Sequence, residues 1–301
     1  MKKTHLILLF ILIILVSCTQ YDSRQAPTKP INVGTKALEI QFLDNAPPNE
    51  VSQKEQFEVG VKLNNIGATS INRGFYSLNY PSQWLRIDDA SGVFNVKGKD
   101  LVPPQGDVRE AIFRAASKEL ASQQDVSDRL ELTLTACFPY STKAGIPVCI
   151  DADQTKKDST KVCQVKPQSL GGGQGGPIAI TKVEPRMQPT KYGDKIIPKF
   201  TLTLQNLGKG FVISEESTNV YCGGRTVDKE NFGVINARVS LGDDELTCST
   251  DQVRLTLDEA NLVCELPTGI DKRLGTYSSF LDIELNYGYV QTATKGVRVR
   301  R

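Results

Sequence analysis

The sequence predicts an all-β chain built as two β-sandwich domains in tandem. Short segments in which apolar and polar residues alternate recur along the chain, with turn residues between them and few credible helices. The two halves carry matching motifs on either side of a Gly-rich stretch. A length of 301 residues also suits two domains, each with its own core.

The N-terminus predicts export. Lys2 and Lys3 precede an apolar run over residues 6–16, which is shorter than the roughly 20 residues of a membrane span and typical of a signal peptide. Leu15-Val16-Ser17-Cys18 resembles a lipobox, so we expect residues 1–17 to be removed and Cys18 to be lipidated. The alternative is an uncleaved signal anchor. Both place the chain at the extracellular face of the cell membrane.

The composition then divides the chain. Residues 18–36 are polar and contain proline, as in a flexible tether. The first domain is expected over 37–168 and the second over 177–301. Residues 169–176 contain five glycines, and because glycine is costly to order, this stretch is predicted to be a hinge about which the domains move independently.

Two internal matches support the duplication. The alternating residues 59–67, which end in Asn65-Ile66-Gly67, align without a gap on residues 200–208, which end in Asn206-Leu207-Gly208. Near the end of each half, an alternating strand leads to an aromatic-x-aromatic motif, Phe138-Pro-Tyr140 or Tyr287-Gly-Tyr289. Gly-containing segments follow at 143–145 and 295–296, so each half is predicted to end in a β-hairpin.

Residues 108–123 present a conflict. Their helix propensity and apolar spacing favour a helix. They occupy the place taken in the second half by residues 261–266, which have the character of a strand. The repeat therefore favours a strand over about 108–115, followed by a loop.

The tandem Asn-x-Gly strand ends and the aromatic-x-aromatic motifs, on an exported chain, resemble the immunoglobulin-like domains of archaeal and bacterial cell-surface lipoproteins, of which the CARDB-type domains are the nearest named group. The resemblance covers about residues 37–166 and 177–301. It implies two immunoglobulin-like sandwiches and a surface location. It brings no catalytic residues, and three cysteines per domain are not part of its general pattern.

The charge balance argues against nucleic acid as a partner. Removal of residues 1–17 takes away two lysines, which leaves 34 basic and 34 acidic side chains. The basic C-terminus, with Lys295, Arg298, Arg300 and Arg301, is interpreted as an edge strand protected by charge.

Common catalytic chemistries are also disfavoured. The single histidine, His5, lies in the signal peptide, so Ser-His-Asp and Cys-His nucleophiles and the usual zinc sites are excluded from the mature chain. We expect no metal, no cofactor and no enzyme activity. Several acidic or Gly-rich segments are assigned to turns and loops rather than to acid–base, calcium or phosphate sites: Asp88-Asp89, Glu215-Glu216, Asp243-Asp244-Glu245, Asp151 with Asp153 and Asp158, and residues 171–176.

One aromatic cluster, Phe75, Tyr76, Tyr80 and Trp84, is a candidate patch for stacking on a sugar or a peptide. Filling of the sandwich core by alternate members is the competing interpretation.

The six remaining cysteines predict disulfides in an exported chain. Cys248 and Cys264 flank a strand and a turn and are paired. In the first half, Cys149 pairs with Cys163 across a charged loop or with Cys137 across the predicted hairpin. The first is favoured, because closing a loop of about 15 residues contributes roughly 3 kcal/mol. Cys137 and Cys222 are then expected as free or buried thiols.

Two functions remain open. The first is a non-enzymatic, membrane-anchored surface protein that acts in adhesion, scaffolding or envelope interaction, with other surface proteins or glycans as partners. The second is a lipid-anchored protein that captures a glycan or peptide at the aromatic patch or at the hinge.

Overall fold

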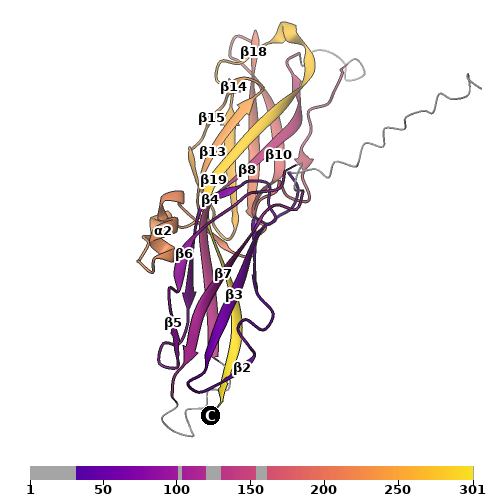
Figure 1. The fold of residues 1–301 in the computed structure, drawn as a ribbon. Helices are drawn as coiled ribbons and strands as arrows, with labels where there is room; N and C mark the ends of the chain where they lie inside the picture. Colours follow the sequence, from indigo (N-terminus) through magenta and orange to yellow (C-terminus); the bar gives the residue numbers. More distant parts are fainter. Residues whose placement is uncertain (1–31, 101–103, 120–129, 154–160, 301) are drawn as a thin grey trace, which may run out of the picture. The chain divides into compact units, whose positions relative to one another are not determined.

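The computed structural model describes residues 32–100, 104–119, 130–153 and 161–300. Strands dominate (Figure 1). The strands are β1 (Leu38–Phe42), β2 (Glu50–Ser52), β3 (Gln56–Asn65), β4 (Ile71–Asn79), β5 (Leu85–Ile87), β6 (Ser91–Val96), β7 (Val108–Ser117), β8 (Leu130–Asp151), β9 (Gln168–Ser169), β10 (Ile178–Pro189), β11 (Lys195–Asn206), β12 (Phe211–Ile213), β13 (Val234–Leu241), β14 (Asp244–Glu245), β15 (Thr247–Cys248), β16 (Gln252–Arg254), β17 (Glu259–Glu265), β18 (Ile270–Asp271) and β19 (Thr276–Arg300). The short helices are η3 (Glu215–Ser217), α2 (Thr218–Cys222), η4 (Lys229–Asn231) and η5 (Lys272–Leu274).

The first sandwich has the strand order of an immunoglobulin domain. One sheet runs β1-β3-β7-β5, the order of strands A, B, E and D. The facing sheet contains β6, β4, β8 and the C-terminal part of β19. The apolar side chains of the alternating segments point into the core between the sheets, where Val59, Val61 and Leu63 are fully buried. The strand expected at 108–115 is confirmed as β7.

The second sandwich repeats this plan. Strands β10, β11, β17 and β15 form the first sheet, and β13, the N-terminal part of β19 and the C-terminal part of β8 form the second. Phe200, Leu202 and Leu204 fill its core.

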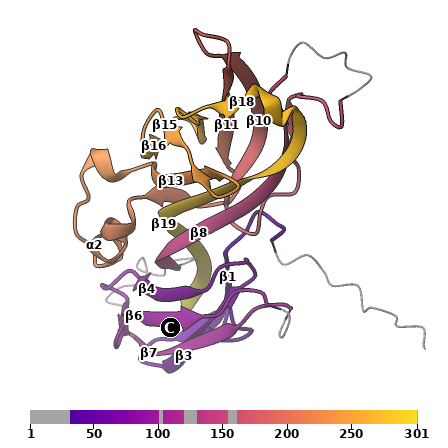
Figure 2. The same ribbon diagram turned by 90° about the horizontal axis from the view of Figure 1, so that it is seen from above.

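The two sandwiches share strands β8 and β19. All 22 residues of β8 pair antiparallel with β19, from Leu130 opposite Val297 to Asp151 opposite Thr276. Both views show the two strands side by side (Figures 1 and 2). Strand β8 therefore acts as strand F of the first sandwich and strand G of the second, and β19 does the reverse.

The predicted terminal hairpins are wrong for this reason. The segment 143–145 continues β8, because Ala144 keeps the inward alternation that Ile146 and Val148 extend. Each F strand runs straight on and pairs with the other half instead of turning back on its own. The exchange resembles a domain swap, here made within one chain.

The predicted hinge is also wrong, because the Gly-rich segment is packed. Gly34 N–H donates to the carbonyl of Gly172 at 2.9 Å, and Gly175 N–H donates to that of Gly34 at 2.8 Å. Gly175 has a φ of +77°, and a Cβ added there would lie 2.5 Å from Cβ of Ala68. Glycine is needed here for left-handed backbone and close approach rather than for mobility.

The duplicated motifs meet at the centre of the ladder. Tyr140 lies opposite Tyr287, Phe138 lies opposite Tyr289, and the four rings pack with centroids 6.0–6.3 Å apart. The two aromatic-x-aromatic motifs therefore form one buried cluster where the sandwiches join. Such ring contacts add to the burial of apolar area.

Candidate functional site

The candidate binding site lies on the outer face of the sheet that contains β8 and β19, which is the face directed away from the two cores. Along β8, even-numbered residues point to the two cores and odd-numbered residues point outward. The outward set includes Cys137, Ser141 and Cys149. Each of the two cysteines attaches a further segment of chain to this face.

The segment between β12 and β13 covers the middle of the outer face. In the first half, β4 borders β8 without interruption, whereas in the second half β12 and β13 border β19 with residues 214–233 between them. A disulfide joins Cys222, at the end of α2, to Cys137, with 5.9 Å between the Cα atoms. This disulfide connects the two halves at a second place, in addition to the shared strands β8 and β19.

This bond corrects the expectation of two unpaired thiols. Cys137 was expected to stay unpaired because Cys149 was assigned to Cys163, and a bond to Cys222 was not expected because the halves were taken as mobile. Both cysteines are buried in a small apolar cluster on the outer face, which also contains Ile213, Val290, Phe75, Phe211, Tyr221 and Phe232. The rival Cys137–Cys149 pairing cannot form, since both residues lie on one continuous strand, twelve positions apart or roughly 40 Å.

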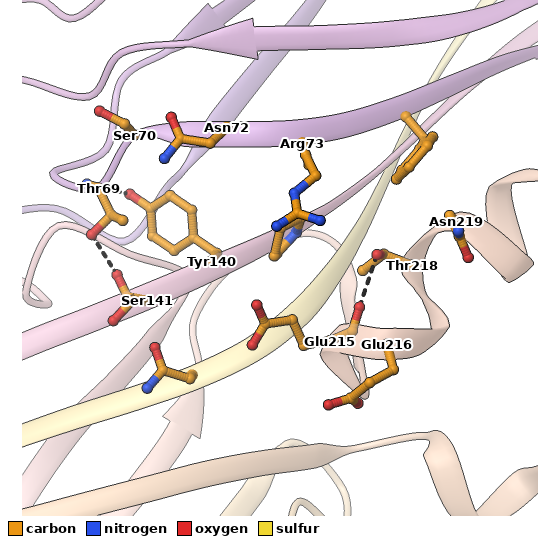
Figure 3. Close-up of a pocket in the computed structure, with 13 residues that line it drawn as sticks. Thr69, Ser70, Asn72, Arg73, Tyr140, Ser141, Glu215, Glu216, Thr218 and Asn219 are labelled. Carbon is orange, nitrogen blue, oxygen red and sulfur yellow. Dashed lines mark hydrogen bonds between the residues drawn. The ribbon is translucent and has the colours of Figure 1, made fainter.

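A groove lies beside this segment (Figure 3). It has a volume of about 580 Å³. Its walls come from both halves: the β3–β4 loop and β4, the centre of β8 and β19, and η3 with α2. The lining residues are Thr69, Ser70, Asn72, Arg73, Phe75, Pro139, Tyr140, Ser141, Glu215, Glu216, Thr218, Asn219 and Asn286.

The chemistry of the groove is polar. Arg73 extends from β4 toward the side that carries Glu215 (Figure 3). Among the described residues, no ion pair involves Arg73, Glu215 or Glu216, so these charges are available to a ligand. The Ser141 hydroxyl is buried and has no hydrogen-bond partner among the residues that the structure describes. Amides of three asparagines add donors and acceptors. Together these groups suit recognition of a polar ligand.

The floor of the groove is held by a hydrogen-bonded motif that both halves repeat. The Tyr140 hydroxyl accepts from Thr69 N–H at 3.0 Å and donates to the carbonyl of Gly175 at 2.8 Å. Asn65 supports the same loop, accepting from Gly67 N–H and donating to the carbonyl of Thr69. Burial raises the pKa of Tyr140 to about 12, although hydrogen bonds from Thr69 and Ala68 lower it, so its hydroxyl stays neutral and structural.

The second half has the same arrangement at equivalent positions. Gly210 N–H donates to the Tyr289 hydroxyl at 2.8 Å, and Asn206 accepts from Gly208 N–H and donates to the carbonyl of Gly210. Burial raises the pKa of Tyr289 to about 12 as well. The glycine of each Asn-x-Gly is required by contact, since a Cβ on Gly67 or Gly208 would lie 2.1 Å from the tyrosine hydroxyl oxygen.

The candidate aromatic patch is not brought together on one surface. Phe75 packs in the outer cluster beside Cys137 and Cys222, whereas Tyr76, Tyr80 and Trp84 pack against the main core. Adjacent residues of a strand point to opposite faces, so Phe75 and Tyr76 cannot present one platform. Only Phe75 contributes to the groove.

The remaining cysteines form the two expected pairs. Cys149 is bonded to Cys163, and Cys248 is bonded to Cys264 between paired positions of β15 and β17. Cys18 and residues 1–17, the predicted signal peptide, lie outside the described residues.

The acidic candidates are dispersed. Asp151 forms an ion pair with Lys161 at 2.7 Å and accepts from the Thr276 hydroxyl at 3.0 Å, and Asp158 lies outside the described residues. Asp88 is paired with Arg86, and Glu245 with Arg238. In the described ranges, no group of three or more metal-ligating side chains gathers.

Sequence reasoning placed Glu215-Glu216 in a solvated turn and did not single out Arg73 or the asparagines. The available signal was the extra length between Ile213 and Val234, together with a cysteine that lacked a local partner. No helix in the described part of the chain is long and apolar enough to span a membrane.

Neither a protein-family model nor a curated protein sequence matches the chain. Among solved structures, the chain is similar to the enterococcal surface protein, partial N-terminal region, with 8% identity over 87% of this chain and 86% of that chain and a TM-score of 0.18. It is also similar to the CupB6 tip adhesin from Pseudomonas aeruginosa, with 11% identity over 89% of this chain and 98% of that chain and a TM-score of 0.19.

Proposed function

We propose that this chain is a non-enzymatic, lipid-anchored protein of the outer cell surface that acts as a rigid adhesion or scaffolding module. The observation that supports this most is the β8–β19 ladder, which passes through both sandwiches without a break. A module without a hinge holds its binding faces in a fixed relation, which suits a protein that supports or attaches to a partner.

Three further features support an extracellular structural role. Three disulfides suit an oxidising compartment. The chain has no histidine after His5, so nucleophile activation by an imidazole is not available. The lipobox-like Leu15-Val16-Ser17-Cys18 supports an anchor at Cys18.

The anchor is tested by mass spectrometry of the mature protein and of a Cys18→Ala variant. We expect a diacylglyceryl-modified Cys18 at the mature N-terminus and an unprocessed or unlipidated Cys18→Ala precursor. An intact segment from Leu15 to Thr19 in the mature wild-type protein would contradict lipid anchoring.

A second candidate function, capture of a glycan or peptide, is favoured by the groove with its available Arg73 and Glu215. The lipidated protein in detergent micelles is screened against glycan and peptide arrays, with Arg73→Ala and Glu215→Ala as variants and Arg109→Ala as a control on an exposed position outside the groove. Binding that the two groove variants lose and the control keeps supports capture. Array binding that all three variants retain would place recognition on another surface. If the wild-type protein binds nothing on the arrays, scaffolding remains as the function.

A further inference from the structure

The edge of β19 that faces away from β8 is only partly covered. Strand β12 pairs with residues 288–290 of β19, and β2 pairs in parallel with residues 298–300. Among the described residues, no strand pairs with this edge over 291–297. At residues 298–300 the basic C-terminus is therefore not the edge strand that was expected, since β2 covers it there and Glu50 contacts Arg298 and Arg300.

The direction of the main-chain N–H and carbonyl groups over residues 291–297 follows from the hydrogen bonds of the neighbouring residues 298–300. Arg298 N–H donates to the carbonyl of Asn49 at 3.0 Å, and the carbonyl of Arg300 accepts from Gln53 N–H at 2.6 Å, so even-numbered residues direct their main chain away from β8. The alternation of a strand then assigns the same direction to Thr292, Thr294 and Gly296. Three N–H groups and three carbonyls thus line an open edge, which is a template for another strand.

A groove runs along one end of the segment 291–297. It has a volume of about 230 Å³ and lies between residues 35–40 and residues 289–292. Lys36 and Lys209 line it and are exposed, and no ion pair within the described ranges involves either of them. Among the described residues of the lining, Glu39 is the one that is acidic, so the rim carries excess positive charge.

We propose that the open edge of β19 at Thr292, Thr294 and Gly296 receives an extended acidic segment of another protein as an added strand. Main-chain hydrogen bonds supply the affinity, and Lys36 and Lys209 select acidic side chains. This site is separate from the groove beside α2 and does not depend on the function proposed for that groove.

Charge and composition disfavour two other occupants. A second copy of the chain would bring its own Lys36, Lys209 and Lys295 against the same lysines. The chain's segment 19–31 contains Pro27 and Pro30 and has one acidic residue against two basic ones, so it suits neither strand addition nor this rim.

Hydrogen exchange measured residue by residue on the full mature protein tests whether the edge is open. Amides of Thr292, Thr294 and Gly296 are expected to exchange fast, whereas those of Ala293 and Lys295, which face β8, are protected. Slow exchange at all three even-numbered positions, or a dimer in light scattering, would show that the edge is already occupied and would overturn the proposal.

Binding is tested by fluorescence anisotropy with a short synthetic peptide of alternating Glu and Val. Thr294→Pro removes an outward N–H without removing a bond to β8, and it should weaken binding by about tenfold or more. Thr294→Val keeps the N–H and is the matched control, with unchanged affinity. Lys36→Glu with Lys209→Glu should weaken binding most at low salt.

A peptide of alternating Lys and Val should bind much more weakly than the acidic peptide. Equal binding of the two peptides, equal binding by Thr294→Pro and wild type, or no binding of the acidic peptide would each refute the proposal. If Thr294→Pro does not fold, the lysine variants and peptide-induced protection of the three amides decide the question.

Discussion

The repeated tyrosine hydroxyls offer a quantitative test of how the two halves are held. Tyr140→Phe removes a hydroxyl that accepts from Thr69 N–H and donates to the carbonyl of Gly175, and Tyr289→Phe removes the equivalent contacts to Gly210 and Asn206. Each substitution leaves polar groups without partners in a buried region. The expected cost is about 1–3 kcal/mol for each variant.

The assay is denaturant unfolding followed by circular dichroism, with thermal unfolding as a second measurement. A loss of 1 kcal/mol corresponds to a fall in melting temperature of about 2–4 °C for a protein of this size. Because the halves share strands, each variant should lower one common transition. Tyr192→Phe is the control, since Tyr192 is 88% exposed and should give no change.

Two results would refute this reasoning. If both variants stay within about 0.5 kcal/mol of wild type, the hydroxyls do not hold the loops. If Tyr140→Phe shifts one of two separate transitions and Tyr289→Phe shifts the other, the halves unfold independently.

Further predictions concern pH, a disulfide and the Gly-rich segment. The pKa values of Tyr140 and Tyr289 are raised from the ordinary 10.0 to about 12 in the folded protein. Their contribution to the free energy of unfolding is therefore complete below pH 10, and about 5 kcal/mol of it, summed over both residues, is lost as the pH rises to about 12. Unfolding measured along an alkaline pH titration will show this loss. Replacing Cys137 and Cys222 with Ala removes a disulfide that spans 85 positions of the sequence and should lower the free energy of unfolding by about 4–5 kcal/mol. Replacing Cys149 and Cys163, which are 14 positions apart, should lower it by about 3 kcal/mol. Denaturant unfolding measures both losses. A disulfide map without Cys137–Cys222 would contradict that prediction. Gly175→Ala should cost more than about 1 kcal/mol, because it forces a left-handed residue against Ala68, while Gly171→Ala has open space and should be neutral in the same assay.

The fold class followed from alternation, because a period of two records which side chains face a core whatever the connection between strands. Residues 59–63 and 200–204 therefore gave β3 and β11, and the repeat correctly favoured a strand for β7 over its helix propensity. Local residues do not record which strand is the neighbour. Gly145 and Gly296 are typical turn residues, yet both continue long strands because the partner across the ladder is the other half.

The candidate site depended on the same long-range information. Arg73, Ser141 and Glu215 are far apart in sequence. They line one groove only because β8 and β19 pair along their whole length, with Tyr140 opposite Tyr287, so no spacing rule could join them. The Gly-rich segment was misinterpreted because composition does not distinguish a coil from a packed left-handed backbone. The disulfide pairs at Cys149 and Cys248 were predictable because each closes a short local loop.

The shared ladder is tested most directly by nuclear Overhauser effects between α-protons of β8 and β19 in the intact protein. Facing residues at non-hydrogen-bonded positions bring these protons closest, so strong signals are expected between Thr133 and Thr294 at one end and between Gly145 and Asp282 at the other. Contacts within a local hairpin, with the α-protons of Cys137 and Cys149 close together and no signal between Thr133 and Thr294, would contradict the account.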